Sequence, residues 1–227
     1  DDTPYGGGAG MLMKAPPLFE AVEHVLQMPI EEHRRTKANH KSHVVFMGPT
    51  GKPFTQEKAR ELATYDQLVI VCGHYEGVDY RVEEHLVDET ISIGDYVLTG
   101  GELPAMVVAD AVARMIPGVL GATSGAIEDS FYHPLLECPQ YTKPQEYRGM
   151  AVPDILLSGH HKNIAEWRME ESLRRTAHLR SELLVRDFTV EEENALRRLL
   201  DKAESEGERS LFEIILSPVE NRKARRK

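Results

Sequence analysis

The sequence lacks the features that would place it in a membrane or in a disulfide-bonded secreted fold. No apolar run approaches the roughly 20 residues that a membrane span needs, and no secretory signal opens the chain. Cysteine is scarce, and Cys72 and Cys138 have no metal-like spacing, so we expect two reduced thiols. These absences predict a cytoplasmic protein with no membrane partner.

Positive charge is also in deficit, since 27 Lys and Arg stand against 37 Asp and Glu, a formal net charge of −10. That balance argues against an indiscriminate nucleic-acid binder, because phosphate contacts need positive charge. The basic residues gather late in the chain, in residues 160–180 and in the tail 217–227. The tail fits a solvated end as well as an RNA contact.

Residues up to 121 alternate apolar runs with helical patterns. Continuous apolar runs at 44–47 and 68–72 end at glycine and predict buried parallel strands. The predicted helices of this part cover residues 18–27, 55–65 with Thr55 as the N-cap, and 105–115. The βαβ pattern indicates an α/β fold with a parallel sheet.

Beyond residue 121 the pattern becomes helical. Helices are predicted at 163–176, from Thr189, and at 210–216. Glu192 lies three residues after Thr189, which is the spacing of a capping box.

The chain therefore divides into two predicted domains. We expect an N-terminal α/β domain over 1–121, a small polar linker over 122–128, and a mainly helical domain over 129–227. Residues 29–41, rich in Glu, Arg, Lys and His, are interpreted as a solvated loop.

Two glycine-rich segments are similar to nucleotide-binding motifs but do not match the full pattern of those motifs. Residues 48–52 have two residues between the glycines where a phosphate-binding loop needs four, and Pro53 follows the lysine. Residues 6–10 lack the preceding strand of a dinucleotide fingerprint. The histidines have no short chelating spacing, so no zinc site is predicted.

Two further glycine-containing segments lie where a ligand would bind. Residues 72–79 follow a buried apolar run, and the carboxyl ends of parallel strands are where open α/β sheets bind ligands. A structural turn would also explain that segment taken alone. Residues 93–104 are punctuated by glycines that permit a backbone wrap, and Pro104 suits the first turn of a helix.

Four segments carry a recognisable pattern in their order along the chain: residues 4–11, 72–79, 93–104, and 117–121 followed by 128–131. They resemble those of the bacterial tRNA (guanine-N(1)-)-methyltransferases, of the SPOUT class of knotted methyltransferases. The resemblance implies a knotted domain that binds S-adenosylmethionine, then a helical tRNA-binding domain. The implied reaction is methyl transfer to ring nitrogen 1 of the guanosine 3′ to the anticodon. Alternatives are a SPOUT enzyme with another RNA target, or a catalytically silent RNA-binding protein.

The resemblance also implies which residues bind the cofactor. They come from four places near strand ends: Pro49, Gly73, Tyr75, Glu76, Gly77, Ser92, Ile93, Gly94, Asp95, Tyr96, Val97, Leu98, Gly100, Gly101 and Pro104. Family members often carry arginine where this chain has His74, so no role is carried over to that side chain.

The chemistry requires a base and a cation. Guanine nitrogen 1 carries a proton at neutral pH, and negative charge spreads to the carbonyl oxygen once a base removes it. By resemblance, Asp129 is the base and Arg114 stabilises the oxygen. From the sequence alone, Asp129 fits an ordinary cap and Arg114 a surface position on a helix.

The resemblance implies three further properties. The enzyme is expected to be a homodimer in which Asp129 acts on the partner's cofactor, and to require magnesium at a site that the sequence does not specify. The family carries one further strand and helix ahead of the segment 4–11. Either this sequence lacks that part or its start is short.

Overall fold

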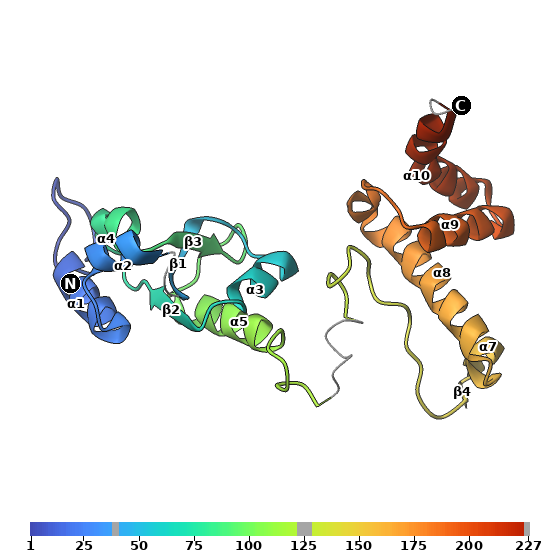
Figure 1. The fold of residues 1–227 in the computed structure, drawn as a ribbon, viewed down its shortest axis with the longest axis horizontal. Helices are drawn as coiled ribbons and strands as arrows, with labels where there is room; N and C mark the ends of the chain where they lie inside the picture. The colour runs from blue at the N-terminus through green and yellow to red at the C-terminus, as the bar shows by residue number, and fades with distance from the viewer. Residues whose placement is uncertain (38–40, 122–128, 225–227) are drawn as a thin grey trace. The chain divides into compact units, whose positions relative to one another are not determined.

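The structure, a computed structural model, describes residues 1–37, 41–121 and 129–224, with side chains up to residue 218. Contacts divide the chain into two compact units, Asp1–Ala126 and Ile127–Lys227 (Figure 1). The predicted linker 122–128 and the end of the predicted basic tail lie outside the described residues.

The N-terminal unit is built on a parallel sheet of three strands in the order β2-β1-β3. The strands are β1 (Ser42–Pro53), β2 (Gln67–Cys72) and β3 (Glu89–Ser92). β1 is central and pairs in parallel with both neighbours, so that Phe46 lies opposite Val71 on one side and Thr90 on the other. The predicted α/β class and parallel sheet are confirmed, while the knot stays a prediction.

The pairing of β1 with β3 is interrupted near the carboxyl end of the sheet. Met47 and Lys52 both pair with Ile91, so residues 48–51 bulge out between them. A Cβ on Gly51 would lie 2.5 Å from backbone atoms of Thr90 and Ile91, and only glycine allows this close approach.

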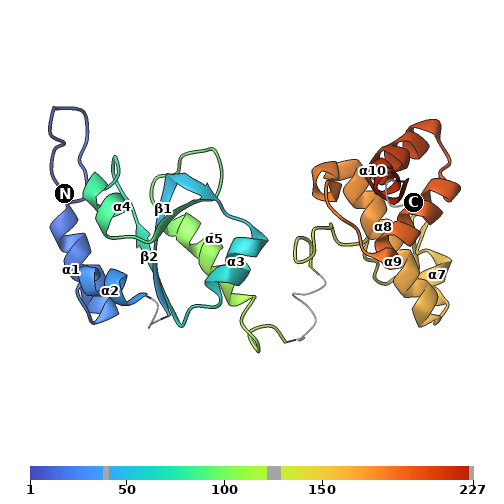
Figure 2. The same ribbon diagram turned by 45° about the horizontal axis from the view of Figure 1, so that its top comes forward.

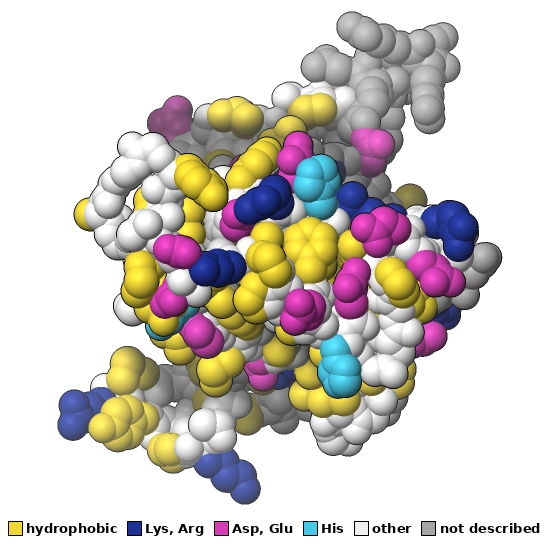
Figure 3. Space-filling view, turned by 90° about the vertical axis from the view of Figure 1, so that its left-hand side faces the viewer, with side chains coloured by type: hydrophobic (Ala, Val, Ile, Leu, Met, Phe, Trp, Pro, Cys, Tyr) yellow, Lys and Arg dark blue, Asp and Glu magenta, His cyan; other side chains and the backbone are white. Residues whose placement is uncertain are grey.

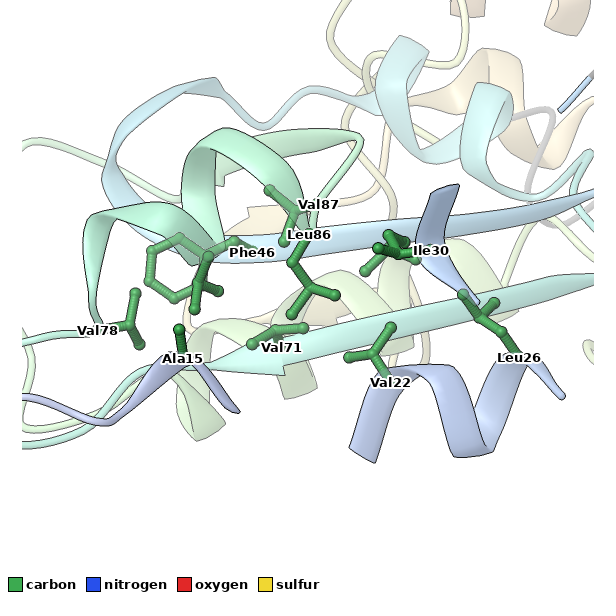
Figure 4. Close-up of a cluster of buried hydrophobic side chains, with 11 residues drawn as sticks. Ala15, Val22, Leu26, Ile30, Phe46, Val71, Val78, Leu86 and Val87 are labelled. Carbon is green, nitrogen blue, oxygen red and sulfur yellow. The ribbon is translucent and has the colours of Figure 1, made fainter. Parts of the chain in front are cut away.

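One face of the sheet is covered by α1 (Ala15–Leu26), α2 (Ile30–Thr36) and α4 (Tyr80–His85). Alternate residues of β1 point to this face, where Val44 and Phe46 join the cluster drawn in Figure 4. The helices and the turns that flank them contribute apolar side chains: Ala15, Val22, Leu26, Ile30, Val82, Leu86 and Val87.

The other face packs against α3 (Gln56–Leu62) and α5 (Glu102–Ala113), which Figures 1 and 2 place away from α1 and α2. Val45 and Met47 of β1 point this way and meet Leu62 and Val108. Because helices cover both faces, the strands need apolar residues at successive positions. This explains the continuous apolar runs in the sequence.

Helix ends differ from the predictions by a few residues. α1 begins at Ala15 instead of residue 18, because proline is tolerated in a first turn where backbone N–H groups have no helical partner. α5 likewise begins at Glu102, which places Pro104 in its first turn. The predicted cap of α3 is confirmed, since Thr55 Oγ1 accepts a hydrogen bond from Lys58 N at 3.2 Å.

The interpretation of residues 29–41 as a solvated loop is wrong. Most of that segment forms α2, and its residues 38–40 are outside the described part. Ile30 and His33, one turn apart, are 3% and 0% exposed, while the charged side chains face solvent. His33 Nε2 lies 3.3 Å from Asp88 Oδ2, a partner 55 residues away that the local composition could not reveal.

The C-terminal unit is mainly helical. A short hairpin of β4 (Glu146–Tyr147) and β5 (Met150–Ala151) precedes α7 (Asp154–Leu157), α8 (His161–Leu179), a 3-10 turn (Ser181–Leu184), α9 (Val190–Lys202) and α10 (Glu206–Ala224). α8 and α10 are longer than predicted. None of the helices in the described part of the chain is long and apolar enough to cross a membrane.

α8, α9 and α10 enclose the core of this unit, where Leu173, Leu196 and Phe212 are each fully buried. The predicted capping box is confirmed, since Glu192 N donates to Thr189 Oγ1 at 3.2 Å and Thr189 N to Glu192 Oε2 at 2.8 Å. These contacts fix the start of α9 against the core.

Candidate functional site

A cavity of about 210 Å³ opens at the carboxyl ends of the three parallel strands. Its walls are residues 46–49 of β1, residues 73–77 after β2, residues 91–94 at the end of β3, and the loop 96–101 that leads into α5. Each of the four segments lies in a strand, directly follows one or leads into a helix, so the sheet and α5 fix their positions. This edge of an open parallel sheet is where ligands bind.

Every residue predicted for the pocket lines this cavity except Asp95. The structure adds lining residues that were not predicted: Phe46, Met47, Gly48, His74, Ile91 and Thr99. Three of these are apolar strand residues, which in sequence look the same as core residues. Their position immediately before the glycine-containing loops is the signal that could have found them.

Two walls of the cavity are joined at Gly101. Its backbone N donates a hydrogen bond to Gly73 O at 2.9 Å. A Cβ there would lie 2.8 Å from Cys72 Cα and 2.9 Å from Gly73 N, so the start of α5 can reach the end of β2 only through a glycine. Burial, with a smaller contribution from the Glu102 charge, raises the pKa of the Cys72 thiol, which favours the neutral form.

The loop after β3 is closed by its own hydrogen bonds. Ser92 Oγ donates to Gly94 O at 3.1 Å and accepts from Gly94 N at 3.2 Å, and Tyr96 OH donates to Ile93 O at 3.3 Å. Beyond this turn Val97 is 88% exposed at the rim of the cavity. The loop is thus shaped by contacts within itself.

The wall formed by residues 73–77 contains a strained turn. Tyr75 has a φ of +58°, which is uncommon for a residue other than glycine and marks a position worth examining for function. Glu76 N donates to Met11 O at 3.1 Å, and Met13 N donates to Gly77 O at 3.0 Å. The N-terminal segment therefore runs beside this wall.

Asp79 has a structural role next to the cavity. Its carboxylate accepts hydrogen bonds from Arg81 Nε at 2.8 Å, the Arg81 guanidinium NH2 at 2.6 Å and Arg81 N at 3.0 Å. The side-chain hydrogen bonds from Arg81, with the backbone one, lower the pKa of Asp79 to about 2. Glu76, in contrast, lines the cavity and is positioned to meet a ligand.

The two predicted catalytic residues belong to different units. Arg114 is the C-cap of α5, where its N donates to Asp110 O at 3.1 Å, and it lies outside the lining of the strand-end cavity. Asp129 is half-buried and lines a second cavity of about 450 Å³ in the C-terminal unit. That cavity lies between the segment 129–140 and α8, and its lining includes Glu137 and Arg168.

Charges on one face of the N-terminal unit are mixed. On the face of the N-terminal unit in Figure 3, Lys and Arg side chains lie among acidic and hydrophobic ones. Within the described ranges, no three His, Cys, Asp or Glu side chains cluster closely enough to hold a metal ion. Cys72 and Cys138 are not joined in a disulfide.

Known proteins resemble this chain over most of its length. The sequence model of the family described as tRNA (Guanine-1)-methyltransferase TrmD matches residues 1–186. The chain belongs to this family. It is 63% identical over 184 residues to the tRNA (guanine-N(1)-)-methyltransferase of Desulforamulus reducens, an alignment that covers 81% of this chain and 69% of the relative. Identity to the protein of that name from Bacillus cereus strain G9842 is 53% over 200 residues, covering 88% and 78%.

The family membership inferred from four short segments is thus confirmed. The part of the chain that matches the tRNA (guanine-1)-methyltransferase family contains both cavities, Arg114 and Asp129. α9 and α10 begin beyond it.

Proposed function

We propose that the chain transfers a methyl group from S-adenosylmethionine to ring nitrogen 1 of the guanosine 3′ to the anticodon in tRNA. The observation that carries the proposal is the strand-end cavity, where glycine-containing loops from three parallel strands meet. Relatives named tRNA (guanine-N(1)-)-methyltransferase support the reaction class. The position within tRNA is an inference from the resemblance of the four segments.

The lining of the cavity suits the cofactor. Tyr96, Val97 and Leu98 offer exposed apolar surface for a flat base, and the backbone of the surrounding loops offers hydrogen-bond donors and acceptors. Glu76 would accept hydrogen bonds from hydroxyl or amino groups of the ligand. S-adenosylmethionine, when bound, would supply a methyl group on a sulfonium, ready for attack by a lone pair.

The protein would prepare that lone pair. Asp129 would accept the proton from guanine nitrogen 1, and Arg114 would donate hydrogen bonds to the guanine carbonyl oxygen, where negative charge develops. Both roles are inferred from the family resemblance of the residues around them. The described residues contain no group of three or more His, Cys, Asp or Glu side chains that could hold a metal ion, and no step is assigned to one.

A homodimer would complete this site. Leu103, Met106 and Val107 follow helical spacing on α5 and are 62%, 67% and 49% exposed, close in sequence to the exposed Val97 at the cavity rim. Exposed apolar side chains grouped on one helix are typical of an interface. We infer that this stripe contacts a second copy, that Asp129 acts on the partner's cofactor, and that the enzyme works in the cytoplasm.

The proposal is tested by methyl transfer from labelled S-adenosylmethionine to an unmodified tRNA transcript. We expect incorporation that disappears in Gly101→Ala, since the added Cβ would meet the backbone of Cys72 and Gly73. Gly207→Ala is the matched control, because a Cβ at Gly207 has nothing within 4 Å and the residue lies outside the four family segments, and it should retain activity.

Three outcomes separate the candidate functions. Binding of tRNA without transfer would favour a silent RNA-binding protein. Transfer to a different nucleotide would favour another RNA target. Calorimetry that detects no cofactor binding to the folded parent protein would contradict the assignment of the cavity.

A further inference from the structure

The segment that carries Asp129 is a compact turn closed by its own hydrogen bonds. Ser130 Oγ accepts from Glu137 N at 2.9 Å, and Phe131 N donates to Leu135 O at 3.0 Å. Phe131 has a φ of +69°, an unfavourable conformation for a side chain of this size. A strained backbone conformation of this kind persists only where the surrounding contacts hold the residue in place.

In this turn, Leu136 is bound to α8 through both of its backbone polar groups. Leu136 N donates to Thr176 Oγ1 at 2.9 Å, and Ser172 Oγ donates to Leu136 O. Thr176 and Ser172 lie one helical turn apart, so both backbone polar groups of Leu136 are bound by hydroxyls on the same face of α8. Thr176 is 0% exposed, so no water replaces its hydroxyl.

A buried threonine in a helix has an ordinary explanation, which is a hydrogen bond to the carbonyl four residues earlier. Thr176 makes that bond, donating to Ser172 O at 2.7 Å. The same oxygen also accepts from Leu136 N, and this second contact joins α8 to the turn with Asp129. Local helix geometry does not require it.

We propose that Thr176, assisted by Ser172, is a positioning residue for Asp129: the two hydroxyls hold the turn 129–137 on α8 and so set the place of the carboxylate. This inference rests on the proposed function, in which Asp129 is the base. Displacing a catalytic group by about 1 Å can slow a reaction on the order of 100-fold, so loss of the tie should affect the chemical step.

The test compares Thr176→Val, which keeps the shape and removes the acceptor, with Thr176→Ser, which keeps the hydroxyl. In single-turnover methyl transfer at saturating protein, Thr176→Val should be slower by about 10- to 100-fold, and Thr176→Ser within about 3-fold of the parent. Affinity for S-adenosylmethionine should change less than about 2-fold. Hydrogen exchange at the Leu136 amide should accelerate in Thr176→Val.

The matched control is Thr189→Val, which removes the hydroxyl that caps α9 in the same unit but has no tie to the turn. It should lower stability yet leave the single-turnover rate within about 2-fold of the parent at a temperature where both are folded. If Thr176→Val also leaves the rate unchanged while folded, the proposal is overturned. If Thr176→Val does not fold, Ser172→Ala takes its place with the same criterion.

A double-mutant cycle with Asp129→Asn separates this inference from the function on which it rests. If Thr176 acts through Asp129, Thr176→Val should not slow Asp129→Asn further. Additive losses would overturn the positioning role. A normal rate in Asp129→Asn alone would refute the base, whereas a slow Asp129→Asn with a normal Thr176→Val would refute only the positioning.

Discussion

Asp129 is the residue on which the proposed chemistry depends most. Asp129→Asn keeps the shape of the side chain but cannot accept the guanine proton. We expect methyl transfer to slow by about 10²- to 10⁴-fold, the usual contribution of a general base, with cofactor affinity nearly intact. Higher pH should partly restore the rate, because solvent then helps to deprotonate guanine. Single-turnover kinetics at saturating tRNA, measured across pH, provide the check.

The competing explanation is that Asp129 only caps a turn in the C-terminal unit. In that case Asp129→Asn would lower the melting temperature and leave the single-turnover rate near that of the parent.

Arg114→Ala offers a second comparison, because it should slow the same step by weakening stabilisation of the charge on the guanine oxygen.

At the residue scale, cavity residues in the glycine-containing loops were easier to predict from the sequence than the apolar residues that line the same cavity. Gly73, Gly94 and Gly101 stand out because glycine after a strand permits conformations that other residues rarely adopt. Phe46 and Ile91 line the same cavity, yet their sequence signal is that of any buried strand. The hydrogen bond from Leu136 N to Thr176 Oγ1 joins residues that are 40 positions apart, so no local sequence pattern indicates it.

At the scale of elements, one buried carboxylate links two helices of the C-terminal unit. Glu170 on α8 is 7% exposed and accepts hydrogen bonds from Arg198 Nε at 2.6 Å and Lys202 Nζ at 2.9 Å on α9. Burial raises the pKa of Glu170, but the hydrogen bonds and charges of Arg198 and Lys202 outweigh it and lower the pKa below the ordinary value.

Glu170→Gln should therefore lower the free energy of unfolding by about 1–3 kcal/mol at neutral pH. The loss should be no larger, because Arg198 and Lys202 keep much of their exposure to water. Because the folded pKa is depressed, the stabilisation is present above the ordinary pKa of glutamate and is lost as pH falls through the folded value. The difference between parent and variant should thus shrink in acid. Denaturant unfolding at neutral and acid pH measures it.

A matched variant on the same helix is Glu166→Gln. Its carboxylate is exposed and lies 3.9 Å from Lys162 Nζ, so the free energy of unfolding should change by less than about 0.5 kcal/mol. Equal losses in Glu166→Gln and Glu170→Gln would contradict the account of the buried link.

Which elements could be predicted depended on where their partners lie. The apolar runs in β1 and β2 were predicted directly, but the continuation of β1 to Pro53 was not. β3 contains Glu89, whose Oε1 lies 2.8 Å from His43 Nε2 of β1. α2 was missed for the same reason, since His33 is buried beside Asp88. Polar residues in these elements make contacts with residues distant in sequence, which composition does not reveal.

At the scale of the whole molecule, the proposed site needs two copies of the chain. We expect a homodimer in sedimentation, and Met106→Glu should weaken it by placing a charge in the apolar stripe of α5. Mixing inactive Asp129→Ala with inactive Gly101→Ala should restore some activity through hybrid dimers, because one of the two sites then has an intact pocket and an intact base. No recovery despite proven subunit exchange would place the whole site within one chain.

The central claim is methyl transfer to ring nitrogen 1 of one guanosine, and locating the methyl group tests it most directly. An unmodified tRNA transcript would be incubated with the protein and S-adenosylmethionine, digested with nucleases and analysed by mass spectrometry. We predict 1-methylguanosine at the position 3′ to the anticodon, and no product when that guanosine is replaced by adenosine. A methyl group on another atom or nucleotide, or continued methylation of the substituted transcript, would contradict the account.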